Sequence, residues 1–262
     1  MRLIPLGTNG FFSSFGRETA CFAIPYKKTL ILLDAGTGLF RLAEPIGKKL
    51  LSDINAVHLY LSHYHLDHTF GFYAAFHLLK DKKVTVFGSH RRQVFWEFVT
   101  LKYFPVDYAK KHKNFKWINL EEGRHKIADY QVSVRKQNHR GEVSLCYRFD
   151  FPEGKSLAYL TDGDPEVGKI PFVEGIDLLL HEHEPARKKI PADLAHLDKL
   201  HAGGHTTPEG AALIAREAQV GELVLIHHLP NVDVHELKKQ LKVAKSVFPK
   251  TELAYDLQEI NF

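Results

Sequence analysis

Three histidines and one aspartate fall within six residues of this chain, directly after a run of apolar residues. The run is "INAVHLYLS" at 54–62, and "HYHLDH" follows at 63–68. The run predicts a buried strand, beside which charged and imidazole side chains cost free energy unless something compensates them. Side chains two residues apart in an extended segment point the same way, so His63 and His65 can bind one ion together. If a helix begins near Thr69, it redirects Asp67 and His68 to a neighbouring position.

Three further residues of the same chemistry follow predicted strands. His139 stands in "VRKQNHRGEVSLCYRF", Asp162 in "LAYLTDGDP" and His227 in "ELVLIHHLP". Each lies where an apolar run ends, so all of them can meet at one edge of the predicted sheets. Imidazole nitrogens together with carboxylates form ligand sets for zinc, manganese or iron. The pattern therefore predicts a metal site to which His227, at the tip of its strand, contributes.

The motif and its partners resemble the metallo-β-lactamase-fold hydrolases, over nearly the whole chain from "LGTNG" at 6–10 to the last histidine. "LILLDAGTGL" precedes the motif, and "YLTDGDP" and "GGHTTPEGAALIAREAQVGELVLIHH" resemble the phosphodiesterase and tRNase Z-like branch. The resemblance implies an α/β fold, a four-layer αββα sandwich, in a single domain over residues 1–262. It implies two divalent metal ions, zinc first with manganese or iron as alternatives. One ion would be held by His63, His65 and His139, the other by Asp67, His68 and His227, and both by Asp162.

Two such ions explain why the charges at 63–68 are tolerated. Metals a few Å apart lower the pKa of a water between them and clamp both oxygens of an in-line displacement. A bridging hydroxide nucleophile then needs no serine or cysteine, and Asp67 can orient it.

His205 stands just before a predicted helix at 207–219. Thr206 and Thr207 can cap this helix, Pro208 suits its first turn, and Glu209 completes a Thr-x-x-Glu capping box with Thr206. A helix N-terminus attracts an anion, so His205, Thr206 and Thr207 are the predicted substrate-binding residues, with His205 as general acid.

"HTT" at 205–207 resembles the family's His-Ser-Thr motif, and "LLLHEHEP" resembles its His-Glu-Ala-Thr motif. This resemblance makes Glu182 the partner of His205. His183 replaces the alanine of that motif, and the sequence leaves the roles of His181 and His183 open.

Apolar periodicity predicts the secondary structure. The expected strands are 2–6, 20–25, 29–34, 56–61, 84–87, 130–137, 144–150, 156–161, 176–181 and 222–227. The expected helices are 39–50, 69–79, 90–100, 207–219 and 233–246.

The net charge of +4 is unevenly distributed. Residues 80–117 hold ten Lys and Arg against three Asp and Glu, with aromatic residues between them. Such a segment can bind an anionic substrate or only cover the site. We therefore expect a small or cyclic-nucleotide-type phosphodiester as substrate. A tRNase Z-like endoribonuclease, a lactone or thioester hydrolase, and a non-catalytic metal-binding module are the alternatives, in that order.

The remaining expectations concern the chain's surroundings. We expect a cytoplasmic protein with no membrane segment, since no apolar stretch is long enough to span a bilayer. Cys21 and Cys146 lie in apolar segments and predict buried, inert thiols. Nucleic acid is a less favoured partner than a small phosphodiester, and a homodimer is left open.

Overall fold

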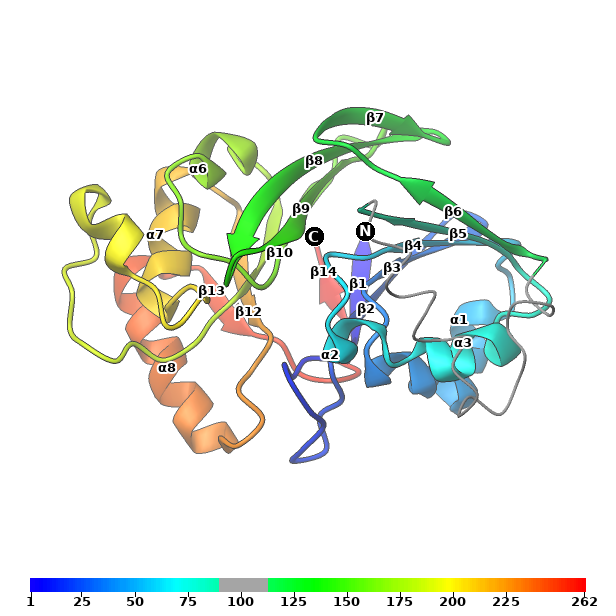
Figure 1. Ribbon diagram of the computed structural model, residues 1–262, viewed down its shortest axis with the longest axis horizontal. Coiled ribbons are helices and arrows are strands. Elements are labelled where there is room, and N and C mark those ends of the chain that lie inside the picture. Colours follow the sequence, from blue (N-terminus) through cyan, green and yellow to red (C-terminus); the bar gives the residue numbers. More distant parts are fainter. Residues whose placement is uncertain (90–112) are drawn as a thin grey trace. The chain divides into compact units, whose positions relative to one another are not determined.

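A computed structural model describes residues 1–89 and 113–262, which divide into two compact units. The N-unit comprises Arg2–Glu121 and Tyr255–Asn261, and the C-unit comprises Glu122–Ala254 with the terminal residues Met1 and Phe262. Figure 1 shows the strands of each unit forming one sheet with helices packed on it. The prediction of a single domain over residues 1–262 stays a prediction.

The N-unit is a seven-stranded mixed sheet in the order β14-β1-β2-β3-β4-β5-β6. Strands β3 to β6 are parallel, and β14, β1, β2 and β3 pair antiparallel. The strands are β1 (Arg2–Gly7), β2 (Cys21–Tyr26), β3 (Thr29–Leu33), β4 (Ala56–Tyr60), β5 (Lys83–Gly88), β6 (Phe115–Asn119) and β14 (Ile260–Asn261). The described helices are η1 (Thr37–Ala43), α1 (Pro45–Leu51), α2 (Leu66–Thr69) and α3 (Phe72–Leu78).

The C-unit is a second seven-stranded mixed sheet, in the order β13-β12-β11-β10-β9-β8-β7. Strands β10 to β13 are parallel and β7 to β10 are antiparallel. The strands are β7 (Gly123–Ile127), β8 (Tyr130–His139), β9 (Glu142–Asp150), β10 (Ser156–Leu160), β11 (Leu178–Glu182), β12 (Glu222–Ile226) and β13 (Thr251–Leu253). The helices are α6 (Lys169–Phe172), η2 (Leu194–Lys199), α7 (Pro208–Glu217) and α8 (Val234–Val247).

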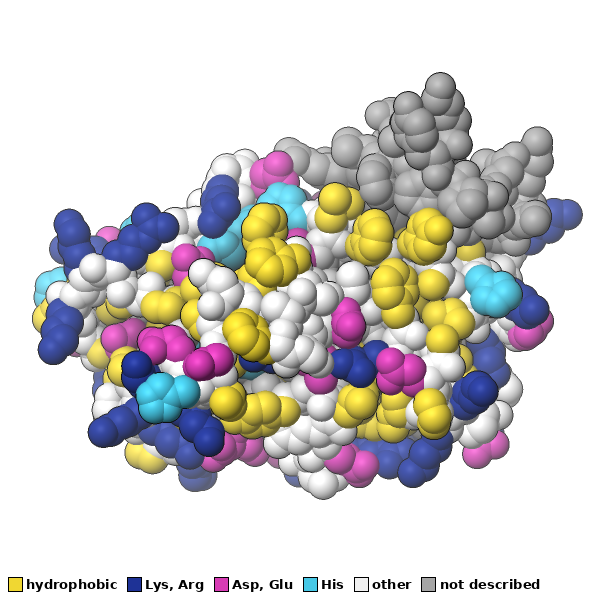
Figure 2. All heavy atoms as spheres, turned by 90° about the horizontal axis from the view of Figure 1, so that it is seen from below, with side chains coloured by type: hydrophobic (Ala, Val, Ile, Leu, Met, Phe, Trp, Pro, Cys, Tyr) yellow, Lys and Arg dark blue, Asp and Glu magenta, His cyan; other side chains and the backbone are white. Residues whose placement is uncertain are grey.

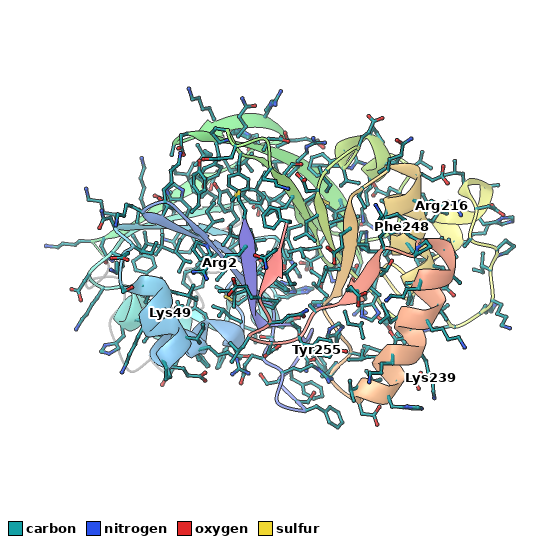
Figure 3. The ribbon with its side chains drawn as sticks, turned by 180° about the vertical axis from the view of Figure 1, so that it is seen from behind. Arg2, Lys49, Arg216, Lys239, Phe248 and Tyr255 are labelled. Carbon is teal, nitrogen blue, oxygen red and sulfur yellow. The ribbon has the colours of Figure 1, made fainter. Side chains whose placement is uncertain are left out.

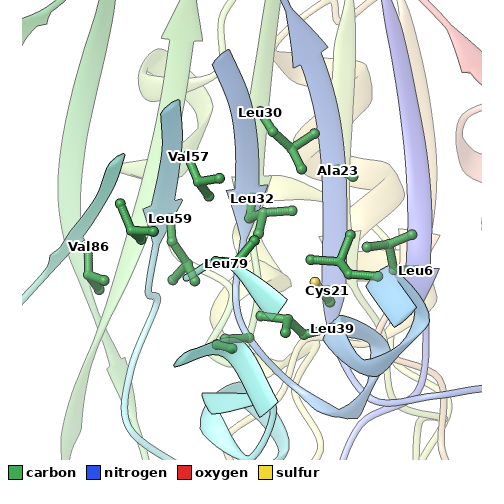
Figure 4. Close-up of a cluster of buried hydrophobic side chains, with 14 of the residues drawn as sticks. Leu6, Cys21, Ala23, Leu30, Leu32, Leu39, Val57, Leu59, Leu79 and Val86 are labelled. Carbon is green, nitrogen blue, oxygen red and sulfur yellow. The ribbon is translucent and has the colours of Figure 1, made fainter. Parts of the chain in front are cut away.

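Each sheet buries apolar side chains beneath its helices. In the N-unit, Leu32, Leu59 and Val86 from adjacent parallel strands lie in one cluster with Leu39 of η1 (Figure 4). In the C-unit, Phe248 follows α8 and packs into the core, whereas Lys239 of the same helix points outward (Figure 3). Parallel strands covered by helices bury both faces, which explains their near-continuous apolar runs.

Both cysteines are buried and free, as expected. Cys21 lies in the N-unit core (Figure 4), and burial raises the pKa of its thiol well above the usual value. Burial also raises the pKa of Cys146 to about 12. Because the thiolate is the reactive form, neither thiol is activated for chemistry.

The expected capping box at α7 is wrong. Thr207, not Thr206, is the N-cap residue, and its Oγ1 accepts a hydrogen bond from the backbone N–H of Gly210 at 3.2 Å. The Oγ1 of Thr206 instead donates to the carbonyl oxygen of Gly163 at 2.8 Å. Glu209 is therefore the second helical residue and cannot form a box with Thr206.

All ten expected strands are present, with ends that shift by at most two residues. The sequence analysis missed β6, β7, β13 and β14. The expected helix 39–50 is divided between η1 and α1 at Glu44, since a residue before proline disfavours helical geometry. The expected helix 69–79 is wrong at its start, because α2 begins at Leu66 and α3 at Phe72.

The expected helix 90–100 and most of the basic segment 80–117 lie outside the described residues. Within residues 1–89 and 113–262 no helix is long and apolar enough to cross a membrane.

The single-domain prediction can be tested with one core leucine from each unit. Leu32 of β3 and Leu225 of β12 are both fully buried. Replacing either with alanine should destabilise the protein by about 2–5 kcal/mol, because it removes buried methyl groups and leaves a cavity. In calorimetry and urea unfolding, both variants should shift one common transition.

Leu194→Ala is the matched control, since Leu194 is 48% exposed and its truncation should change stability by less than about 0.5 kcal/mol. Two transitions, with each core variant shifting only one of them, would show that the units unfold separately and would contradict the prediction.

Candidate functional site

The HxHxDH motif begins three residues after the end of β4 in the N-unit. The rings of His63 and His65 lie 4.4 Å apart between centroids, as expected for side chains two residues apart in an extended segment. The rings of His63 and His68 lie 4.3 Å apart. The turn into a helix occurs earlier than Thr69, because His65 precedes the first residue of α2. The motif therefore brings its three histidines into one cluster within this unit.

Asp34 orients two of these histidines from the end of β3. One of its carboxylate oxygens accepts hydrogen bonds from Nδ1 of His68 at 2.6 Å and from Oγ of Ser62 at 2.7 Å, and the other accepts from the Ser62 N–H at 2.7 Å. Since the Ser62 hydroxyl donates to Asp34, it accepts from Nδ1 of His63 at 3.0 Å. With both Nδ1 atoms protonated, the Nε2 atoms of His63 and His68 carry lone pairs.

Asp67 lies at the first turn of α2, with its Oδ2 3.4 Å from Nε2 of His68. The same oxygen accepts a hydrogen bond from the backbone N–H of Phe11 at 2.8 Å. Phe11 belongs to the β1–β2 loop and has a positive φ of 61°, so this loop is held in an uncommon conformation where it meets Asp67. Gly36 permits the close approach on the other side, since a Cβ there would collide with the carbonyl oxygen of Asp67.

The C-unit brings together the three residues predicted at its strand ends. His139 is the last residue of β8, Asp162 lies two residues beyond β10, and His227 directly follows β12. Nε2 of His227 lies 3.0 Å from Oδ1 of Asp162, and Nε2 of His139 lies 3.7 Å from Oδ2 of Asp162. Nδ1 of His139 donates to the carbonyl oxygen of Gly204 at 3.0 Å, so its Nε2 also carries a lone pair.

His205 is bound to the buried carboxylate of Glu182, the pairing that the sequence motif implied. Nδ1 of His205 donates to Oε2 of Glu182 at 2.6 Å, and the two rings of His205 and His139 lie 4.9 Å apart. Burial lowers the pKa of His205, but the Glu182 carboxylate outweighs burial and raises it to about 9. Burial raises the pKa of Glu182, but His205 outweighs it and holds that pKa below its usual range. His205 is therefore protonated at neutral pH.

A second reading of His205 comes from the same geometry. Asp162, Glu182, His205 and His227 each offer one ligand atom, and these atoms all lie within 4.8 Å of one another. The position of His205 thus suits a proton donor and also a metal ligand.

His183, directly after β11, and His228, two residues after β12, form a separate chain of contacts. Nε2 of His183 and Nδ1 of His228 lie 2.8 Å apart, and Nε2 of His228 donates to the carbonyl oxygen of Ala254 at 2.8 Å. Since His228 donates from Nε2, its Nδ1 accepts from His183. Burial lowers the pKa of His183 well below its usual value and that of His181 to about 3, so both are neutral. With both ring nitrogens of His228 engaged, His227 is the candidate ligand at this position.

The sequence analysis missed three residues that contact the candidate site residues. Asp34 and Ser62 follow apolar strands as the motif does, but an Asp or Ser at a strand end is also a common turn former. Glu184 has its Oε2 3.8 Å from Nε2 of His205. The sequence feature that could have revealed Glu184 is its position two residues after Glu182 in "HEHEP", which places a second carboxylate near the same histidine.

The donor sets in both units fit divalent metal ions. In each unit a buried hydrogen-bond acceptor fixes Nδ1 of one or more histidines and leaves Nε2 for an ion, with a carboxylate beside it. Acceptors that hydrogen-bond to the other ring nitrogen orient metal-binding histidines and raise their basicity.

Asp34→Asn tests this arrangement in the N-unit. Asp34 has a positive φ of 58°, which asparagine tolerates, so the backbone should be kept while the negative charge is lost. We expect roughly 10- to 100-fold weaker metal affinity, because His68 loses its charged acceptor. Competition for zinc with a chromogenic chelator measures this.

Asp53→Asn is the control, since Asp53 is an exposed residue of the same unit. Unchanged metal affinity in Asp34→Asn would mean that His68 does not bind metal through Nε2, the nitrogen that keeps its lone pair while Nδ1 donates to Asp34.

Comparison with known proteins identifies the family. Residues 29–228 match the family model described as the beta-lactamase superfamily domain. A stretch of 103 residues is 33% identical to ribonuclease BN of Salmonella paratyphi B, which is 39% of this chain and 32% of that protein. The match thus spans about a third of the length of this curated relative.

Several solved structures match the chain from end to end. The metallo-β-lactamase-fold protein YhfI of Bacillus subtilis has a TM-score of 0.73 at 23% identity, over 99% of this chain and 98% of that one. The short form of human tRNase Z has a TM-score of 0.69 at 21% identity, over 100% and 99%. The expected fold class, the αββα metallo-β-lactamase sandwich, is confirmed. The chain therefore belongs to the beta-lactamase superfamily of metal-dependent hydrolases, as the sequence resemblance predicted.

Proposed function

We propose that this protein is a dinuclear metal-dependent phosphodiesterase that acts on a small or cyclic-nucleotide-type phosphodiester. The carrying observation is the buried His205–Glu182 pair beside Asp162 and His227, which places an imidazole with a carboxylate partner next to candidate metal ligands. A reaction that releases an alkoxide needs such a proton donor.

The proposed metal ligands are those implied by the sequence resemblance. His63, His65, Asp67 and His68 of the N-unit and His139, Asp162 and His227 of the C-unit would together hold two divalent ions, with zinc preferred. Such ions supply Lewis acidity and lower the pKa of a bound water. Asp67 would orient the attacking water, and the Phe11 N–H keeps its carboxylate in place.

His205 would protonate the leaving oxygen of the diester. The 2.6 Å bond to Glu182 fixes its ring and favours the imidazolium form, so Nε2 is the nitrogen that can deliver a proton. Thr206 and Thr207 would support it at the start of α7. Their hydroxyls are buried and engaged with Gly163 and Gly210, so they hold the loop that carries His205 in place.

A second candidate is an endoribonuclease of the tRNase Z type. The 33% identity to ribonuclease BN over 103 residues favours it. A lactone or thioester hydrolase and a non-catalytic metal-binding module follow, in that order.

A metal-supplemented screen tests the proposal. The purified protein should bind about two divalent ions per chain and hydrolyse bis-p-nitrophenyl phosphate and cyclic nucleotides faster than a lactone or a thioester. Precursor tRNA in the same screen tests the second candidate. Turnover of the lactone or thioester without any diester activity would contradict the proposal, and a protein that binds no metal would favour the binding module.

His205→Ala tests the role of the proton donor. Both ions should stay bound, while turnover of a substrate with an alkoxide leaving group should fall roughly 10²- to 10⁴-fold. The loss should be smaller with p-nitrophenolate as leaving group, because this group needs little protonation. Metal analysis and steady-state kinetics on both substrate types give the result.

His196→Ala is the matched control, since His196 is a half-buried histidine that pairs with Asp193 in η2. If His205→Ala loses metal, His205 is a ligand and the coordination scheme is wrong. Full activity on both substrate types would remove the acid role.

A further inference from the structure

The loop that carries His205 is clamped at its tip by the turn between β8 and β9. The backbone N–H of Ala202 donates to the carbonyl oxygen of His205 at 2.7 Å, and that of Thr207 donates to Leu200 at 2.9 Å. Gly203 and Gly204 form the tip with positive φ values of 61° and 91°. Nε of Arg140 donates to the carbonyl oxygen of Gly203 at 2.6 Å, and a Cβ on Gly204 would collide with the Arg140 side chain.

Two arginines converge at this tip. The point where a Cβ on Gly203 would stand lies 3.6 Å from Nη2 of Arg187 and 3.9 Å from Nη2 of Arg140. Both arginines are exposed. Gly203 and His205 are two residues apart, so their Cα atoms lie no more than about 7 Å from one another. Both guanidinium groups therefore lie at the tip of the loop that carries the proposed proton donor, within reach of a position two residues before it in the chain.

Two guanidinium groups at one loop tip repel each other, and an anion bound by both offsets that repulsion. Neither guanidinium has a carboxylate within 4.0 Å in residues 1–89 and 113–262, and Glu184 lies against His205 instead. Arg187 lines two cavities. One of about 320 Å³ has Lys188, Lys199 and His201 and no acidic residue in its described lining, and the other has Glu209 and Glu236 in its lining. At the left of Figure 2, where the chain between α6 and α8 lies in Figure 1, Lys and Arg side chains are exposed with Asp and Glu side chains among them.

We propose that Arg140 and Arg187 bind a second phosphate group of the substrate, one that neighbours the scissile diester. Guanidinium groups bind phosphate oxygens through two parallel hydrogen bonds, which suits an exposed pair with no carboxylate partner. The inference rests on the proposed phosphodiesterase function and narrows its substrate to nucleotide esters that carry a further phosphate. Arg140 also holds the loop tip, so Arg187 is the residue whose replacement isolates phosphate binding.

Two chromogenic esters that differ in one group provide the test. Thymidine 5′-(p-nitrophenyl phosphate) has the diester alone, and its 3′-phosphorylated form adds the second phosphate with the same leaving group. The metal-loaded wild-type protein should prefer the 3′-phosphorylated ester in kcat/KM. Arg187→Glu should lower kcat/KM for that ester roughly 10- to 100-fold, mainly through KM, and should leave the other ester nearly unchanged.

Arg216→Glu is the matched control, because Arg216 is an exposed arginine near the far end of α7 that pairs with Glu217 (Figure 3). It makes the same change in net charge away from the loop tip. Arg187→Lys keeps the charge but loses the planar fork, so it should recover part of the preference.

The outcomes separate this inference from the proposed function. Equal kcat/KM for both esters in the wild type, or equal losses in Arg187→Glu for both, overturns the second phosphate site and leaves the phosphodiesterase proposal intact. The same selective loss in Arg216→Glu would assign the effect to net charge and also overturn it. A wild type that hydrolyses neither ester refutes the proposed function and this inference with it.

Discussion

The candidate site of the C-unit depends on the hydrogen bonds that the carboxylate of Glu182 accepts. It is fully buried at the end of β11 and accepts hydrogen bonds from Nδ1 of His205, from the N–H of Gly163 and from the N–H of Thr206. A buried carboxylate is costly unless it is fully paired, so the same charge holds the turn after Asp162 and the segment with His205 and Thr206 against the end of β11. One side chain thus fixes the turn after Asp162, the start of α7 and the ring of His205.

Asp34 does the same in the N-unit. It is also fully buried, and it joins the end of β3 to Ser62 and His68 beyond the end of β4. In both units a carboxylate behind the candidate ligands pairs with an imidazole Nδ1. The orientation of each ring is therefore built into the strand ends before any ion binds, which reduces the entropy lost on binding.

The sequence reveals those parts of the structure that depend on long apolar patterns. The parallel strands bury both faces and read as continuous apolar runs, and polar residues beyond their ends indicated His63, Asp162 and His227. His139 was indicated by its place at the end of the antiparallel strand β8. Strand β13 has three residues and β14 two, too few for any periodicity, and β7 ("GRHKI") has no apolar alternation. Asp34 escaped for a different reason, because its function depends on a residue of the next strand, which sequence spacing does not show.

His183 shows how a departure from a family motif can be explained by a distant partner. Taken alone, a histidine in place of alanine beside Glu182 suggested either a catalytic role or none. In the fold it is buried against His228, whose other nitrogen donates to Ala254 beyond β13. The pair links the ends of β11, β12 and β13 directly behind His227, which has a positive φ of 57°. A strained backbone persists only where its surroundings hold it, and the two neutral imidazoles supply that support without adding charge. The substitution is thus part of the scaffold that presents His227.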